Sequence, residues 1–208
     1  MRQNLFYLVV LLLSSSVIDE TVCAPTKPPP KPQPKPTGTV PAIQSLRSLC
    51  KILNYDPFTH GGLTNHTLNK AGEPIKFYQT GYKDRVEYVL ASVTPQTINS
   101  KGSVTNDATR KFARSMGKPT DDAGHIIGNK LGGTGKDTYN IFPQDLKINR
   151  GKWNQAEIKI RDSVLLSNQP VEVVVQLYYD KPQDTRPVRF FYIAAFDKKC
   201  ESGAVINP

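Results

Sequence analysis

The sequence predicts an α+β fold in which helices flank a central antiparallel sheet. Three observations favour it: strand-like runs that come in pairs, apolar residues at helical spacing between those pairs, and a length that suits one packed domain. Four runs are rich in β-branched and aromatic residues: Ile75–Thr80, Arg85–Thr94, Val171–Tyr179 and Val188–Phe196. The first two enclose a plausible hairpin turn at 81–84. The last two, separated by 181–187, most simply pair as antiparallel neighbours.

Three segments carry apolar residues at helical spacing. They are Ala42–Leu53, Asn106–Met116, and a segment from Asn149 to about Leu166. In the last segment Trp153, Ala156 and Ile160 follow Asn149 by four, seven and eleven residues, which puts all four on one face. Asn149 is therefore expected to point toward the core. The alternative is that it caps the amino-terminal end of this helix, a role that asparagine fills well.

An amino-terminal leader is expected at Met1–Ala24. Arg2 precedes the apolar run Leu5–Leu13, which is too short to cross a bilayer and is followed by small residues, as in secretory signal peptides. Cleavage after Ala24 fits the small-residue rule, and a cut nearer Ser16 is the alternative. We therefore expect a secreted, extracellular protein. No later segment approaches transmembrane length, so no membrane partner is expected.

Residues 25–41 differ in composition from the rest of the chain. Proline and lysine dominate them, which predicts an extended, polyproline-like linker without a core of its own. A sharper interpretation is that Lys27, Lys31 and Lys35 contact a polyanion. Residues 42–208 remain as one domain of a size that can bury a core.

The cysteines and the charge agree with an exported protein that meets polyanions. Removal of the leader takes Cys23 away and leaves Cys50 and Cys200, which are expected to form a disulfide. It also removes one arginine and two carboxylates, which raises the formal charge from +9 to +10. Such a domain is attracted to nucleic acid, glycosaminoglycan or an anionic cell surface, and charge alone does not choose among them.

Two short motifs each allow a functional and a purely structural interpretation. Asn65-His66-Thr67 is an N-glycosylation sequon, which in a secreted eukaryotic protein would mark Asn65 as part of an exposed loop. Residues 132–135, Gly-Gly-Thr-Gly, look like a phosphate-cradling loop but lack the Walker lysine and hydroxyl pair, and they are interpreted as a flexible turn.

The candidate active site lies in residues 121–157. Asp122 precedes His125 by three residues, and Gly124 between them allows backbone conformations that side chains forbid. An inward-pointing Asn149 offers an uncharged oxygen near a histidine. This suits a hard cation such as Mg²⁺, which keeps several waters and needs few protein ligands.

These residues resemble the DNA/RNA non-specific endonuclease family of the ββα-metal (His-Me finger) class, whose hallmark is Asp-Arg-Gly-His followed by a metal-binding asparagine. Residues 122–125, Asp-Ala-Gly-His, are similar to the hallmark. Residues 140–144, Asn-Ile-Phe-Pro-Gln, resemble the family's Asn-hydrophobic-x-Pro-Gln segment, and Asn149-x-Gly151-x-Trp153-x-x-x-Glu157 resembles its metal-ligand helix with the same spacing. The resemblance covers residues 121–157 and implies a ββα-metal active-site core within the α+β fold.

The resemblance also implies a role for each matching residue. His125 would be the general base that activates a water, and Asn149 the single direct protein ligand of Mg²⁺, with Mn²⁺ as the alternative ion. Glu157 would hold the waters of the metal, while Asn140 and Asp122 would fix the loop and the ligand. The substrate would be DNA and, as a second candidate, RNA. Hydrolysis of a phosphodiester fits this set, because a neutral imidazole deprotonates the water and a cation stabilises the developing negative charge.

One position departs from the family pattern. Ala123 stands where the best-known members have arginine, so a cation that could contact phosphate is missing. In this the sequence resembles a branch of the family, common among secreted nuclease toxins, that tolerates a small residue at this position. The candidate replacements and substrate contacts are Arg85, Arg110, Lys118 and Arg150. An inhibitor or immunity protein is conceivable, but no docking motif for one is visible.

Three functions are therefore weighed. The leading one is a secreted, metal-dependent endonuclease with little sequence preference. The second is a polyanion-binding protein on a nuclease scaffold that lost its activity through Ala123. The third is a hydrolase acting on another phosphodiester or on a sulfate ester.

Overall fold

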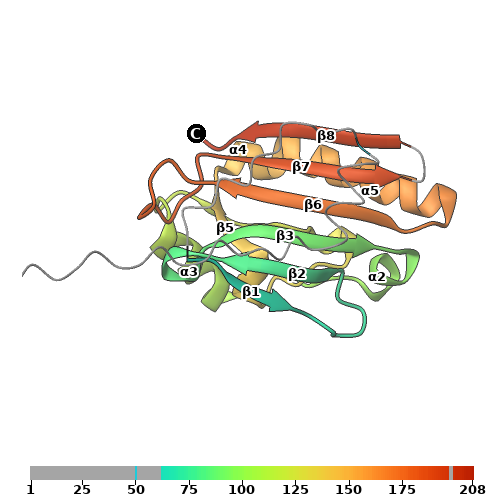
Figure 1. Ribbon diagram of the computed structural model, residues 1–208, viewed down its shortest axis with the longest axis horizontal. Coiled ribbons are helices and arrows are strands. Elements are labelled where there is room, and N and C mark those ends of the chain that lie inside the picture. Colours follow the sequence, from blue (N-terminus) through green and yellow to red (C-terminus); the bar gives the residue numbers. More distant parts are fainter. Residues whose placement is uncertain (1–49, 51–61, 197–198) are drawn as a thin grey trace, which may run out of the picture. The chain divides into compact units, whose positions relative to one another are not determined.

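The protein folds around a six-stranded antiparallel sheet in the order β1-β2-β3-β6-β7-β8. The computed structural model describes Cys50, residues 62–196 and residues 199–208. The strands are β1 Thr64–Thr67, β2 Ile75–Thr80, β3 Val86–Val93, β6 Val171–Tyr178, β7 Arg189–Phe196 and β8 Lys199–Ile206. Figure 1 shows them side by side in this order, with α5 (Asn154–Ser167) behind them. The predicted central antiparallel sheet is confirmed.

Both predicted strand pairs are present, with small differences at their ends. β2 has the predicted bounds, and β3 ends at Val93 because Thr94 caps the next helix, α2 (Pro95–Ser100), by accepting a hydrogen bond from the Thr97 backbone N–H at 3.1 Å. The expected turn at 81–84 contains a short 3-10 segment, Tyr82–Asp84. The outer strands β1 and β8 and the helix α2 were not predicted.

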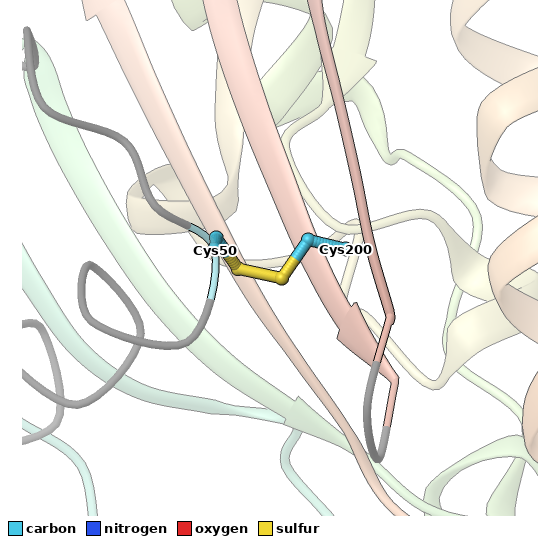
Figure 2. The surroundings of a disulfide bond; sticks show 2 residues. All are labelled: Cys50 and Cys200. Atoms are coloured by element: carbon cyan, nitrogen blue, oxygen red, sulfur yellow. A yellow bond between two sulfur atoms is a disulfide. The ribbon is translucent and has the colours of Figure 1, made fainter.

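The central strands bury side chains on both faces of the sheet, which explains their nearly continuous apolar sequences. In β3, Val89 and Ala91 join the large cluster that packs against α5. Tyr88 and Leu90 alternate with them and join a second cluster on the other face, against which Cys50 packs. Cys50 forms the predicted disulfide with Cys200 of β8, with their Cα atoms 5.4 Å apart (Figure 2).

The helices on the site side differ from the prediction at one end. α3 (Asp107–Met116) ends as predicted and begins one residue later than predicted, because Asn106 is its cap. The later helix starts before Asn149, because α4 (Leu146–Ile148), a π-helical turn (Asn149–Trp153) and α5 follow one another without a break. Asp145 caps it by accepting hydrogen bonds from the backbone N–H groups of Lys147 and Ile148 at 2.9 and 3.2 Å. The alternative of Asn149 as the cap is therefore wrong.

Trp153 fixes this helix to the large sheet. Its side chain is 1% exposed, and its ring makes edge contacts with Phe190 and Tyr192 of β7 at centroid distances of 5.2 Å each. Ile160 and Val164 of α5 belong to the same core. The residues that precede Trp153 are thereby held at a fixed place beside the sheet.

Several expectations fall outside the described residues. These are the leader Met1–Ala24, the linker 25–41 and, apart from Cys50, the predicted helix Ala42–Leu53. Within the described part of the chain, no helix has the length and apolar character that a membrane crossing requires.

Candidate active site

A small two-stranded sheet forms the floor of the site. β4 (Asp122–His125) pairs antiparallel with β5 (Ile141–Gln144), and the helix that starts at Leu146 follows at once. The arrangement of two strands and a helix is the ββα core that the resemblance implied. Gly124 is required here for space, because a Cβ atom on it would come within 2.1 Å of the Gln144 side-chain oxygen.

His125 is held in the tautomer that a general base needs. Its Nε2 lies 2.9 Å from the Ser103 carbonyl oxygen, which only accepts hydrogen bonds, so Nε2 carries the proton and Nδ1 carries the lone pair. Burial lowers the pKa of the imidazole below its ordinary value, and the hydrogen bond to Ser103 opposes this in part. The backbone oxygen of His125 accepts from Trp153 Nε1 at 3.2 Å, which ties β4 to the helix that carries Asn149.

Asn149 and Asp122 meet across the site as the resemblance implied. Asn149 donates through Nδ2 to Asp122 Oδ2 at 3.0 Å, and within the described residues its Oδ1 has no hydrogen-bond partner. The amide is thus turned so that an oxygen is left for a ligand. Arg150 donates to both oxygens of the same carboxylate at 3.2 Å each, so Asp122 neutralises the arginine and fixes the asparagine.

Glu157 is a buried carboxyl group with an unsatisfied oxygen. It is 8% exposed, and its Oε1 has no hydrogen-bond partner within the described part of the chain. It lies against Gly128, where a Cβ atom would come within 2.5 Å of Oε1. Burial raises the pKa of Glu157 to about 8, against the lowering effects of the Gly128 backbone and Lys130. A buried acceptor without a donor is the feature that a hydrated cation would satisfy.

Asn140 contacts the loop between the strands rather than the cleft. It is fully buried, accepts from the Ile127 backbone N–H at 2.8 Å, and donates to the carbonyl oxygens of Ile127 and Thr134 at 2.9 Å each. Asn140 therefore fixes the loop, as the resemblance implied, and does not reach the reacting groups itself.

Residues 132–135 are not the flexible turn that their composition suggested. Gly132, Gly133 and Gly135 are buried, and a Cβ atom on Gly133 would come within 1.8 Å of the Ile127 carbonyl oxygen. The Gly135 backbone N–H donates to Ser103 Oγ at 2.9 Å, and the Ser103 N–H donates to the Gly133 oxygen at 3.2 Å. The packed loop thus holds the residue whose carbonyl orients His125.

Two expected substrate contacts lie elsewhere. Arg85 is 2% exposed, pairs with Glu87 at 2.7 Å, and donates to the carbonyl oxygens of Pro182 and Asp184, so it stabilises the β6–β7 connection and cannot contact a substrate. Lys118 is exposed beyond the end of α3 but is not among the residues that line the cleft.

The site groups share a cleft of about 390 Å³. Asp122, Ala123, His125, Asn149 and Arg150 line it together with Arg110 and Arg114 of α3 and Asn129. Arg110 was a candidate from the sequence, whereas Arg114 and Asn129 were missed. The available signal for Arg114 was its position four residues after Arg110, on the same side of a helix.

Asn65 is exposed, as a glycosylation acceptor must be, but it lies on the edge strand β1 and not in a loop. Its side-chain oxygen accepts from Gln79 Nε2 at 2.9 Å. Glycosylation at this residue stays a prediction.

The donor set fits a cation that keeps most of its waters. Within the described residues no group of three or more histidine, cysteine or acidic side chains could enclose a metal. One amide oxygen, from Asn149, and the unsatisfied Glu157 carboxyl instead border a second hollow that also touches His125. Few protein ligands and oxygen chemistry are typical of Mg²⁺ sites.

Comparisons with known proteins agree with this geometry. The model of a family described as DNA/RNA non-specific endonuclease matches residues 64–195. A curated relative, the probable deoxyribonuclease RhsA of Dickeya dadantii (strain 3937), is 51% identical over 63 residues, which is 30% of this chain and 4% of that protein. The match therefore spans a small part of the relative.

Two solved structures are similar to this chain at low sequence identity. The Sda1 nuclease with bound zinc ion has a TM-score of 0.50 and 13% identity, over 74% of this chain and 87% of that chain. NucA from Streptococcus agalactiae with magnesium ion bound has a TM-score of 0.44 and 18% identity, over 76% and 77% of the two chains.

Proposed function

Because the chain belongs to the DNA/RNA non-specific endonuclease family, we propose that it is a metal-dependent endonuclease that hydrolyses DNA, with RNA as a second substrate. The observation that carries the proposal is that His125 and Asn149 line the same cleft. His125 has its lone pair on Nδ1, and Asn149 donates to Asp122 through Nδ2, which leaves its Oδ1 for a ligand.

His125 acts as the general base. Burial keeps the imidazole neutral at physiological pH, and the Ser103 carbonyl fixes the ring so that Nδ1 takes the proton of the attacking water. Loss of a general base typically lowers the rate by about 10²–10⁴-fold.

Asn149 would hold the divalent cation through its free Oδ1, and Glu157 would accept hydrogen bonds from the waters of that cation. A bound cation supplies positive charge to the developing phosphorane oxygens and the leaving group. Oxygen ligands favour Mg²⁺, with Mn²⁺ as the alternative ion, over zinc, which prefers nitrogen and sulfur. The structure of the Sda1 nuclease, to which this chain is similar, holds a zinc ion, so both ions belong in the test.

The substrate is bound mainly through its phosphates, so we expect little sequence preference and a steep dependence of binding on salt. A digest with preferred cut sites would count against this part of the proposal.

We also propose that the protein is secreted after cleavage near Ala24. The leader pattern and a disulfide that closes most of the chain support export, because disulfides persist in oxidising compartments. Amino-terminal sequencing of protein collected from the culture medium of an expressing cell tests it. Retention in the cell with Met1 intact would contradict it.

The test of the nuclease proposal is incubation of supercoiled plasmid with the mature protein in Mg²⁺, in Zn²⁺, in EDTA, and with the His125→Ala variant in Mg²⁺. Cleavage that needs both the metal and His125 supports the proposal. An intact plasmid, with DNA retained in a gel shift by a protein whose disulfide has formed, would favour the binding protein that lost activity at Ala123.

A further inference from the structure

Three adjoining hollows meet at Asn129. The first is the cleft that holds His125, and the second, of about 280 Å³, shares His125 and Asn149 with it and reaches Glu157. The third, of about 360 Å³, is lined by Asn129, Lys101 and Lys130 among others. The shared residues indicate one groove that passes the candidate base, with Arg114 in the first hollow and Lys130 in the third.

At one end of this groove, α3 contributes an unpaired cation. Of the three arginines that line the first hollow, Arg150 is bound to Asp122, and Arg110 donates to Asp107 at 2.8 Å and to a backbone carbonyl at 2.7 Å. Arg114 is exposed and makes no hydrogen bond or ion pair within the described part of the chain. Its charge is therefore available to an anion that enters the cleft.

The other end of the groove carries two exposed lysines. Lys130 lies 3.3 Å from Asn154 Oδ1, and Asn154 lines the second hollow, so the ammonium is directed along the groove. Lys101 has a φ of 52°, a backbone conformation that residues with side chains rarely adopt. The adjacent Gly102 N–H donates to the Asn129 oxygen at 3.0 Å, which fixes this segment to the centre of the groove.

We propose that one nucleic acid strand runs through this groove in both directions, with a phosphate on one side of the scissile bond held by Arg114 and a phosphate on the other side held by Lys130. The proposal rests on the proposed function, and it assigns to α3 the cation that Ala123 removes from β4. The nucleic acid strand is bound on both sides of His125, so the enzyme cuts inside a nucleic acid chain and acts poorly on a dinucleotide.

Binding in EDTA tests the two contacts without cleavage. Fluorescence anisotropy of a labelled single-stranded oligonucleotide is measured over a range of salt for the wild type, Arg114→Ala, Lys130→Ala and the double variant. Lys111→Ala is the matched control, because it removes the same charge from an exposed position on α3 that does not line the groove.

Each variant should lower the slope of log affinity against log salt by about 0.7, and the double variant by about 1.4. A fourfold rise in salt then weakens binding about 3-fold less for each single variant than for the wild type. Lys111→Ala should keep the wild-type slope. Equal slopes for the wild type and both groove variants would overturn the proposal, as would an equal loss in Lys111→Ala.

Cleavage of an end-labelled oligonucleotide in Mg²⁺ tests the two-sided arrangement. Arg114→Ala should move the distribution of cuts toward one end of the oligonucleotide and Lys130→Ala toward the other, because fewer nucleotides are then needed on the side that lost its contact. Shifts toward the same end would overturn it. Variants that lower the slope as predicted, together with a wild type that never cuts, would refute the proposed function and leave the groove standing.

Discussion

Glu157 should make the metal-free protein lose stability as the pH rises, and Glu157→Gln should remove this loss. The carboxyl is buried beside Gly128, and its Oε1 has no partner within the described residues, so the charged form is disfavoured in the folded state. Its pKa is raised from 4.5 to about 8. Glutamine has nearly the same shape and never ionises.

The sign follows from the protons bound in each state. Below pH 4.5 the carboxyl is protonated in both states, and its titration does not affect stability. Between 4.5 and about 8 the unfolded chain releases the proton while the folded protein keeps it, so the free energy of unfolding falls by about 1.4 kcal/mol per pH unit. Between pH 5 and 8 the loss amounts to about 3.5 kcal/mol, an upper figure because any water that enters the cleft would partner Oε1.

Urea unfolding in EDTA at several pH values measures this difference. The gap in stability between Glu157→Gln and the wild type should widen from pH 5 to pH 8. Glu172→Gln, on β6 and outside the cleft, should follow the wild type. Parallel curves for the wild type and Glu157→Gln would refute the account of Glu157.

Other predictions test separate parts of the structure. At saturating Mg²⁺, the acid limb of kcat/KM should be centred below 6.5, because burial lowers the pKa of His125, and a limb centred higher in a pH–rate profile would contradict this. Replacing Cys50 and Cys200 by serine opens a link across 150 residues and should lower the free energy of unfolding by up to about 5 kcal/mol, and unchanged urea denaturation would argue against it. Gly133→Ala should destabilise by about 1–3 kcal/mol in the same assay because its Cβ meets backbone, whereas Gly151→Ala, with nothing within 4 Å, should stabilise by about 0.5–1 kcal/mol. Equal effects of the two alanines would show that the loop is not tightly packed.

The strands and the main helices could be predicted because their signals are local. The β-branched and aromatic runs of β2 and β3 and the helical spacing of Trp153, Ala156 and Ile160 follow from which faces are buried. The start of the later helix was missed because Asn149, four residues after the actual cap Asp145, is also a residue type that favours helix caps.

Part of the site depends on contacts between distant segments, which the sequence does not display. The spacing predicted His125 and Asn149, but not that the Ser103 carbonyl sets the tautomer or that a buried glycine loop holds Ser103. The prediction that Arg85 contacts substrate was wrong because Arg85 is buried by residues far away in the sequence, such as Pro182 and Asp184. Glu87, two residues on and therefore on the same face of the strand, was the available sign of a structural ion pair.

The most direct test of the central claim is chemical rescue of the base. Single-turnover cleavage of DNA by His125→Gly in Mg²⁺ is measured with and without added imidazole. We predict a rate about 10²–10⁴-fold below the wild type, restored in part by imidazole and only in its neutral form. A variant that cuts at the wild-type rate, or that stays inactive at every imidazole concentration while it still binds DNA and metal, would contradict His125 as the general base.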